Sequence, residues 1–165
     1  MKKLLVFILF FVIVSGFIPV TSYGAGEERF VFTDLTATDK KTGLMWTKDA
    51  NIAKKTLTWK KTFKFIEKLN KQKYAGYGDW RLPKIEELET LLDYAKKQGY
   101  KGYPLKMDCE GCPSELFNKI GFKNVQAWRY WSSTEWVVGM ASGDVFGLGT
   151  GDMADSCVWP VRGGK

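Results

Sequence analysis

Hydrophobic residues recur at every third or fourth position in two segments, a period that predicts amphipathic helices. The first segment, residues 57–69, has an apolar stripe made of Trp59, Phe63, Ile66 and Leu69. Lysines fill its opposite face, and Thr56 or Thr58 can cap its start. The second segment, residues 83–97, has a stripe made of Ile85, Leu88, Leu91 and Leu92. It begins at Pro83, which suits a first helical turn.

Strand-forming runs lie on both sides of the helical segments. Residues 30–32 and 44–46 predict a hairpin that turns at residues 39–43. Later strands are expected at 130–134, continuing through 136–138, and then at 145–148 and 158–161. We expect Val161 to lie beside the first hairpin. The stretch 98–125 exceeds an ordinary loop, so a helical turn is expected within it at 114–120.

Four motifs resemble one bacterial domain family. They are KKTGLMW at 40–46, GYGDWRLPKIEELETL at 76–91, YWSST at 130–134 and VWPVRGG at 158–164. In this order they resemble the Lcl C-terminal (DUF1566) domain family, over roughly residues 30–164. The resemblance implies an α+β, C-type-lectin-like fold in which two helices pack on twisted antiparallel sheet and the chain ends are brought together.

The motifs also indicate which residues have structural roles. These are Trp46, Asp79, Trp80, Arg81, Pro83, Trp131 and Arg162. Asp79 is expected to accept hydrogen bonds at a turn or helix start, and the guanidinium of Arg81 to bind loop carbonyls or a carboxylate. Glu86 and Glu87 are expected to favour the positive end of the second helix dipole.

The first 24 residues resemble a secretory signal peptide. Lys2 and Lys3 precede an apolar run at residues 4–14, and small residues lie near a cleavage point at Gly24. A retained membrane anchor is the alternative, because the apolar stretch approaches spanning length. Cleavage leaves residues 25–165 as a single domain, with only a transient membrane contact and a periplasmic or secreted location.

The charge of the remaining chain is moderately basic. Without Lys2 and Lys3, 23 of the 25 basic residues stand against 18 acidic ones, a net charge of +5. Such a balance fits plain solubility, or attraction to acidic polysaccharide by the lysine-rich segment 54–68. Nucleic acid is not an expected partner, because no matching motif is present.

Three cysteines, Cys109, Cys112 and Cys157, are candidates for disulfide bonding. Export favours a structural disulfide, either between Cys109 and Cys112 or between one of them and Cys157. A redox pair is the alternative for the CxxC spacing. Half a zinc site is disfavoured because the chain has no histidine.

The sequence gives little support for enzymatic activity. Absence of histidine removes the commonest general base, and the carboxylates near Glu86 have no catalytic context. Ser132, Ser133 and Thr134 lack the flanking glycines of a nucleophile elbow. The resemblance extends distantly to formylglycine-generating enzymes, but Cys157 stands alone where those enzymes have a catalytic pair. Their oxidase activity is therefore not implied.

Candidate ligand-binding residues gather in the glycine-rich late region. They are Trp128, Arg129, Trp136, Asp144, Asp152 and Asp155, and Met140, Ser142 and Thr150 lie among them. Indole rings stack on sugars, and Asp and Arg bind hydroxyl groups. No cofactor is expected, although the three aspartates could bind calcium if they converge.

The expected function is therefore an exported, non-enzymatic binding module of an adhesin-like kind. It is expected to recognise a glycan, an acidic polysaccharide or a surface protein. Two alternatives stay open. One is a cysteine-dependent redox or oxidase enzyme on the same scaffold, and the other is a structural envelope component.

Overall fold

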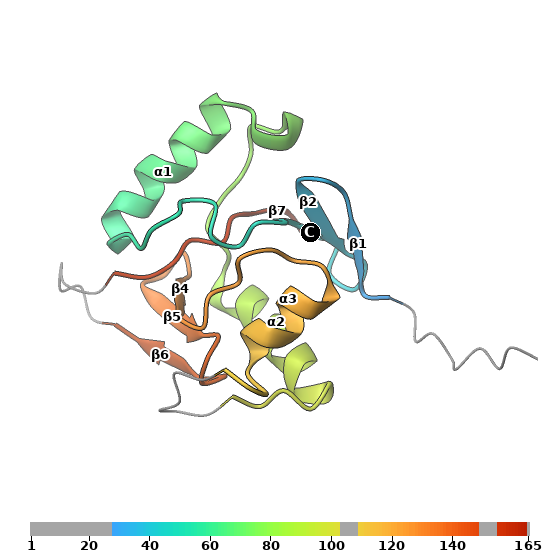
Figure 1. Ribbon diagram of the computed structural model, residues 1–165. Coiled ribbons are helices and arrows are strands. Elements are labelled where there is room, and N and C mark those ends of the chain that lie inside the picture. Colours follow the sequence, from blue (N-terminus) through green and yellow to red (C-terminus); the bar gives the residue numbers. More distant parts are fainter. Residues whose placement is uncertain (1–27, 103–108, 149–154, 165) are drawn as a thin grey trace, which may run out of the picture.

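The computed structural model describes residues 28–102, 109–148 and 155–164, and it has an α+β architecture (Figure 1). Two antiparallel sheets and three α-helices make up the described part of the chain. One sheet has the strand order β1–β2–β3–β7 and the other has the order β4–β5–β6. The helices are α1 (Trp59–Lys71), α2 (Ile85–Lys97) and α3 (Pro113–Ile120). None of the described helices is long and apolar enough to cross a bilayer.

The first sheet joins the two ends of the domain. Its strands are β1 (Phe30–Phe32), β2 (Thr36–Asp39), β3 (Leu44–Thr47) and β7 (Val161–Gly163). Trp46 pairs with Val161 across β3 and β7, which confirms the expected place of Val161. The predicted simple hairpin was wrong, because β2 lies between β1 and β3. The turn at residues 39–43 is present, and it connects β2 to β3.

The second sheet is a meander of β4 (Arg129–Trp131), β5 (Trp136–Gly139) and β6 (Val145–Gly147). Residues 130–138 were expected as one continuous extended segment, which was wrong. The chain reverses tightly after Ser132, where the Ser132 N–H donates to the Trp136 carbonyl at 2.8 Å. Residues 158–160 are also not a strand, because β7 begins only at Val161.

A terminal segment, residues 156–163, connects both sheets. The Cys157 N–H donates to the Arg129 carbonyl at 2.8 Å, and Trp131 donates back to the Cys157 carbonyl at 3.1 Å. Further along, Val161 exchanges backbone hydrogen bonds with Arg81 at 2.8 and 3.0 Å. In Figure 1 this segment runs between α1 on one side and α2 and α3 on the other.

Two apolar clusters of unequal size hold the layers together. The larger cluster is built from the first sheet, α2, α3, β4 and β5, and Trp159 lies in it fully buried. The ring of Trp159 has its centroid 5.0–5.8 Å from those of Trp46, Phe117, Phe122 and Tyr130. The smaller cluster consists of Leu57, Ile66, Leu82 and Val158, and it fastens α1.

The two long helices agree with their predicted periods but start later than expected. Leu57 precedes α1 and instead exchanges backbone hydrogen bonds with Ser156. Thr58 occupies the N-cap position without a side-chain hydrogen bond. Pro83 lies just outside α2, whose N-cap is Lys84. Phe63 was expected on the packed stripe of α1 but is 45% exposed, because the buried face is narrower than predicted.

A buried ion pair fixes the start of the described domain. Arg29 binds both carboxylate oxygens of Asp39, at 3.0 Å from Nε and 2.6 Å from Nη2. Its Nη1 also donates to the Thr90 carbonyl of α2 at 2.9 Å. Burial opposes ionisation of Asp39, but the hydrogen bond and charge of Arg29 outweigh it and lower the pKa of Asp39. The pair thus attaches β1 and β2 to α2.

Candidate functional site

The register of the second sheet brings four of the six candidate residues to one end. Arg129 pairs with Gly139, and the Gly139 N–H donates to the Asp144 carbonyl at 2.9 Å. The Trp128 carbonyl accepts from Met140 at 2.9 Å. Trp128, Arg129 and Asp144 therefore lie at the same end of the sheet. We call this end, together with Asp155, the Trp128 end.

Trp128, Arg129 and Asp155 are in direct contact there. The guanidinium carbon of Arg129 lies 4.9 Å from the centroid of the Trp128 ring, which is a cation–π distance. Arg129 Nη2 and Trp128 Nε1 both point to the Asp155 carbonyl, at 3.3 and 3.4 Å. Asp155 thus contributes its backbone oxygen to this contact. The buried Nε of Arg129 has no hydrogen-bond acceptor among the described residues.

Trp136 lies at the opposite end of the β4–β5 ladder. Its strand partner is Gly147, and a Cβ atom on that glycine would lie 3.8 Å from the indole ring. The register separates Trp128 from Trp136 by four residue pairs, or about 13 Å along the strands. Trp128 is 48% exposed and Trp136 is 49% exposed. The candidates therefore mark the two ends of one sheet and do not form one pocket.

Other residues of the late region divide between core and surface. Met140 is fully buried and cannot contact a ligand. Ser142 accepts a hydrogen bond from the Asp144 N–H at 3.3 Å and so shapes the turn before β6. Asp152 and Thr150 lie outside the described residues. Within the described part of the chain, no three metal-ligating side chains come together.

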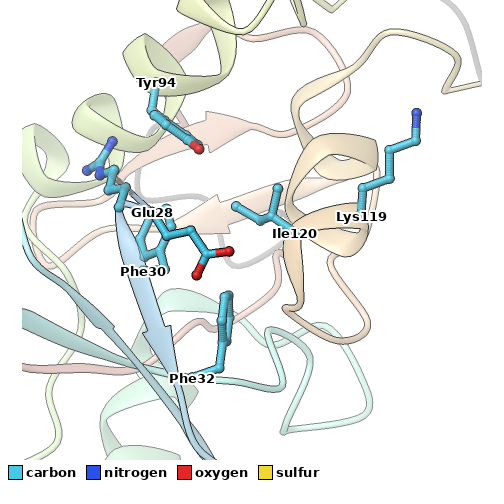
Figure 2. Close-up of a pocket in the computed structure, with 7 residues that line it drawn as sticks. Glu28, Phe30, Phe32, Tyr94, Lys119 and Ile120 are labelled. Atoms are coloured by element: carbon cyan, nitrogen blue, oxygen red, sulfur yellow. The ribbon is translucent and has the colours of Figure 1, made fainter. Parts of the chain in front are cut away.

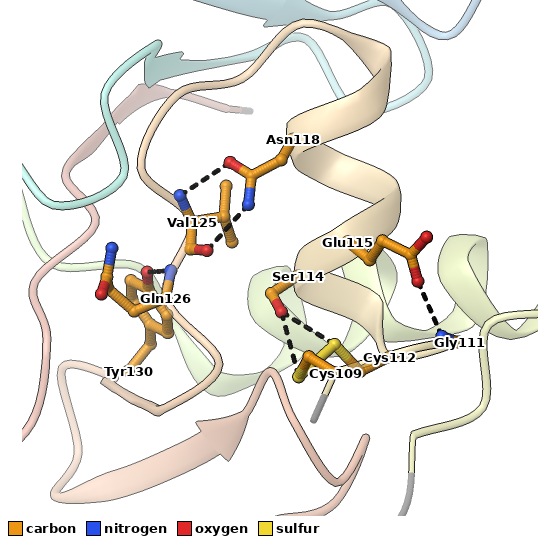
Figure 3. Close-up of a disulfide and its surroundings, with 9 residues drawn as sticks. All are labelled: Cys109, Gly111, Cys112, Ser114, Glu115, Asn118, Val125, Gln126 and Tyr130. Carbon is orange, nitrogen blue, oxygen red and sulfur yellow. Dashed lines mark hydrogen bonds between the residues drawn. A yellow bond between two sulfur atoms is a disulfide. The ribbon is translucent and has the colours of Figure 1, made fainter. Parts of the chain in front are cut away.

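An open cavity of about 500 Å³ adjoins the Trp128 end. Its lining is formed by Cys109, Ser114, Glu115, Asn118, Lys119, Val125 and Ala127. Ala127 directly precedes Trp128, although Trp128 itself is not part of the lining. Asn118 fixes the cavity wall by exchanging hydrogen bonds of 2.9 and 3.0 Å with the backbone of Val125 (Figure 3).

A second cavity, of about 330 Å³, lies between β1, α2 and α3. Figure 2 shows its lining residues: Glu28, Arg29, Phe30, Phe32, Tyr94, Lys119 and Ile120. No sequence pattern pointed to it, because its walls come from segments far apart in the chain. Arg29 is already occupied by Asp39 and Thr90, so its guanidinium is not available for a ligand.

A third, smaller cavity of about 220 Å³ lies beside α1. It is lined by Phe63, Ile66, Arg81, Leu82, Lys84 and Ser133. Phe63 and Ile66 belong to α1, and three lysines of the same helix, Lys61, Lys64 and Lys68, face solvent as predicted. The cavity thus places an exposed aromatic ring beside a basic helix face.

Arg81 has the structural role expected of it. It forms a two-point ion pair with Glu87, at 2.7 and 2.8 Å, and donates to the Gly163 carbonyl at 2.9 Å. Burial favours the neutral form of Glu87, but the bonds from Arg81 and the Lys84 N–H outweigh it and lower the pKa of Glu87. The start of α2 is thereby tied to β7.

Asp79 has a different role from the one expected. It was predicted to accept hydrogen bonds at a turn or helix start, but its carboxylate binds Arg162 at 2.7 and 3.0 Å. The guanidinium of Arg162 also lies 3.8 Å from the centroid of the Tyr77 ring. The hydrogen bond from Arg162 lowers the pKa of Asp79. The Asp79–Arg162 pair and the hydrogen bond from Arg81 to the Gly163 carbonyl therefore join the GYGDWRLP motif to the terminal VRGG motif.

The tryptophans predicted to be structural are all buried. Trp80 Nε1 donates to the Tyr74 carbonyl at 2.9 Å, next to a short 3₁₀ turn (Tyr74–Gly76). Trp131 Nε1 donates to the Leu57 carbonyl at 2.7 Å. Trp46 packs edge-on against Trp159. These residues build the scaffold that carries the candidate site.

The cysteines are resolved into one disulfide and one free thiol. Cys109 and Cys112 are joined, with Cα atoms 5.2 Å apart, which excludes the alternative pairing with Cys157. Cys157 is free and buried. Burial raises the pKa of its thiol to about 11, although the neighbouring Tyr130 hydroxyl lowers it in part. A thiol of this kind is protonated and unreactive near neutral pH.

Comparison with known proteins gives a family and nothing narrower. No match was found among curated proteins or among solved structures. The family model described as the Lcl C-terminal domain matches residues 35–162, a range that begins in the β1–β2 turn and ends in β7. The chain belongs to the Lcl C-terminal domain family.

Proposed function

We propose that the protein is an exported, non-enzymatic module that binds a glycan or a similar surface polymer through the exposed tryptophans at the two ends of its second sheet. The observation that carries the proposal is the pair of half-exposed tryptophans, Trp128 and Trp136, about 13 Å apart on one rigid ladder. Tryptophan is enriched among the residues that contribute most to binding interfaces. Each ring can act as a separate contact point for the polymer.

Arg129 gives the Trp128 end its polar component. Its guanidinium is held against the indole, and its Nη2 donates to the Asp155 carbonyl at 3.3 Å. Pairing a ring face with a fixed donor suits a sugar, which has an apolar face and hydroxyl or acidic groups at its rim. The lysine-rich face of α1 supports the proposal by attracting polyanions from a distance.

Binding to immobilised heparin and to a glycan array, with and without calcium, tests this proposal directly. Replacing Trp136 or Trp128 by alanine is expected to weaken binding at least tenfold, since truncating an aromatic anchor typically costs about 2 kcal/mol or more at an interface and 1.4 kcal/mol is a factor of ten. Val31→Ala is the matched control, because Val31 is 52% exposed on the other sheet. Unchanged binding in both tryptophan variants would contradict the assigned surface.

The contribution of the basic helix is separable from that of the tryptophans. The double variant Lys61→Glu and Lys64→Glu is expected to slow association and to lose its effect at high salt. Lys96→Glu with Lys97→Glu provides the control, because these lysines are equally exposed but lie on α2. If no glycan is bound and a surface protein is captured through the same tryptophans, the ligand class changes while the surface stays assigned.

A further inference from the structure

The disulfide lies at the start of α3, and its two sulfurs differ in access (Figure 3). Cys112 is the N-cap of the helix and is only 2% exposed. Cys109, three residues earlier, is partly exposed and lines the cavity of about 500 Å³. Cys112 is not part of that lining. An incoming group in the cavity therefore meets Cys109 first.

Ser114 connects both sulfurs to the helix. Its hydroxyl oxygen lies 2.9 Å from the Cys112 sulfur and 3.6 Å from the Cys109 sulfur. Disulfide sulfurs carry no proton, so the Ser114 hydroxyl is the donor in both contacts. Ser114 is itself buried, and its N–H is bound to the Met140 carbonyl at 3.0 Å. The hydroxyl is thus held at the position where negative charge appears when the S–S bond breaks.

The Ser114 hydroxyl is the group placed to stabilise a Cys112 thiolate. The backbone N–H groups of the first turn do not serve this purpose, because Pro113 has none and those of Ser114 and Glu115 donate to the carbonyls of Met140 and Cys112. The carboxylate of Glu115 is occupied elsewhere, since it binds the Gly111 N–H at 2.7 Å and Lys119 at 3.0 Å. A leaving sulfur that receives a hydrogen bond favours exchange.

We propose that Cys109–Cys112 is an exchangeable disulfide that reacts with the cysteine thiols of a partner dithiol. A partner thiolate attacks the Cys109 sulfur, the Cys109–Cys112 bond breaks, and Cys112 leaves as a thiolate bound by Ser114. The product is a mixed disulfide between Cys109 and the partner. The partner's second thiol then releases Cys109, so the partner is oxidised to its disulfide and this chain gains two electrons and becomes a dithiol. The reactivity is independent of polymer binding.

The Cys109–Cys112 disulfide is not required to hold the fold together. A disulfide stabilises mainly by restricting the unfolded chain, and this one closes a loop with a sequence separation of only 3. The cavity wall formed by Asn118 and Val125 is held by its own hydrogen bonds. Reduction is therefore expected to leave the fold in place.

Equilibration of the full chain in glutathione redox buffers, followed by acid trapping, alkylation and mass spectrometry, tests the proposal. Cys109 and Cys112 are expected to pass between disulfide and dithiol within the range of these buffers, with unchanged circular dichroism. Ser114→Ala is expected to shift the equilibrium about tenfold towards the disulfide, because a hydrogen bond to a charged group is lost. Ser133→Ala is the matched control. A disulfide that stays oxidised in excess reduced glutathione would overturn the proposal.

The order of attack is tested with single-cysteine variants, which also guards against misfolding of Ser114→Ala. With oxidised glutathione, Cys112→Ser is expected to form a mixed disulfide at Cys109 at least about tenfold faster than Cys109→Ser forms one at Cys112, because exchange depends on access. Equal rates, or faster reaction at Cys112, would contradict the assignment of Cys109 as the attacked sulfur. Cys157 serves as the internal control and is expected to stay unmodified.

Discussion

The tryptophans of the core are buried, whereas Trp128 and Trp136 of the second sheet are half exposed, so the same side chain has two different environments. Trp80, Trp131 and Trp159 each donate their indole N–H to a backbone carbonyl at 2.7–2.9 Å. Trp136, 49% exposed, makes no such bond among the described residues. Trp46 is the exception among the buried tryptophans, because it is 0% exposed and its Nε1 has no hydrogen-bond partner among the described residues. Burial in the aromatic core, more than the indole hydrogen bond, therefore separates the structural tryptophans from Trp128 and Trp136.

The hydrogen bonds of two buried tryptophans also connect residues that are far apart in the sequence. Trp131 and Trp159 reach carbonyls 74 and 112 residues away, so each closes a long loop of the fold. Trp128 has only a 3.4 Å contact to Asp155 and keeps 48% of its surface in solvent. Removing a core tryptophan should therefore reduce stability, and removing an exposed one should reduce binding.

Trp159→Ala is expected to give the largest effect on the core side of the comparison. The change empties a site that is 0% exposed and surrounded by four aromatic rings. Such truncations cost about 3–5 kcal/mol of unfolding free energy. Urea denaturation followed by circular dichroism measures it. A loss below about 1 kcal/mol, the average for any substitution, would show that Trp159 is not central.

Asp39→Asn is expected to cost about 3 kcal/mol, at the low end for a broken buried ion pair because Arg29 keeps its bond to Thr90. The cost depends on pH. Since folding lowers the pKa of Asp39 from its ordinary value of 3.8, the pair stabilises the fold above that value. Its contribution disappears as the pH falls through the lower folded pKa. Unfolding curves of both proteins from pH 7 to pH 2 should therefore converge.

Glu87→Gln is expected to cost about 1 kcal/mol, because its partner Arg81 is partly exposed and solvent screens the pair. The lowered pKa of Glu87 places the loss of this contribution below pH 4.5. At neutral pH the variant should be less stable than the parent chain, and the difference should vanish in acid. A difference independent of pH would assign the effect to packing.

Trp136→Ala should have the smallest effect on stability, within about 0.5 kcal/mol, as for most surface substitutions. Its expected effect on glycan binding is large by contrast. Thermal unfolding and binding measured on the same preparation separate the two. A variant whose unfolding temperature is much lower than that of the parent would show that Trp136 stabilises the fold.

Much of the fold was predictable because the two long helices have clear apolar periods. Leu88, Leu91 and Leu92 are fully or almost fully buried in α2, as their spacing indicated. The strand β2 was missed because its sequence, TATD, contains no large apolar residue. It is stabilised by pairing on both sides and by the Arg29–Asp39 ion pair, which are long-range contacts that no local pattern reports.

The candidate site was predictable in composition but not in arrangement. The aromatic and charged residues of the late region were identified, yet the tight turn after Ser132 was not. That turn decides that Trp128 and Trp136 lie at opposite ends of a ladder. The cavity beside Cys109 could not be anticipated, since it forms where α3 meets residues 125–127. Local sequence indicates which side chains are available, and strand register decides which of them meet.

The pairing of β7 with β3 has a consequence for engineering. The register places the start of β1 and the end of β7 at the same end of one sheet, about 14 Å apart across three strand spacings. A linker of about six residues spans that gap. The domain can therefore be spliced into a surface loop of a host protein, or circularly permuted, without covering Trp128 and Trp136 of the second sheet.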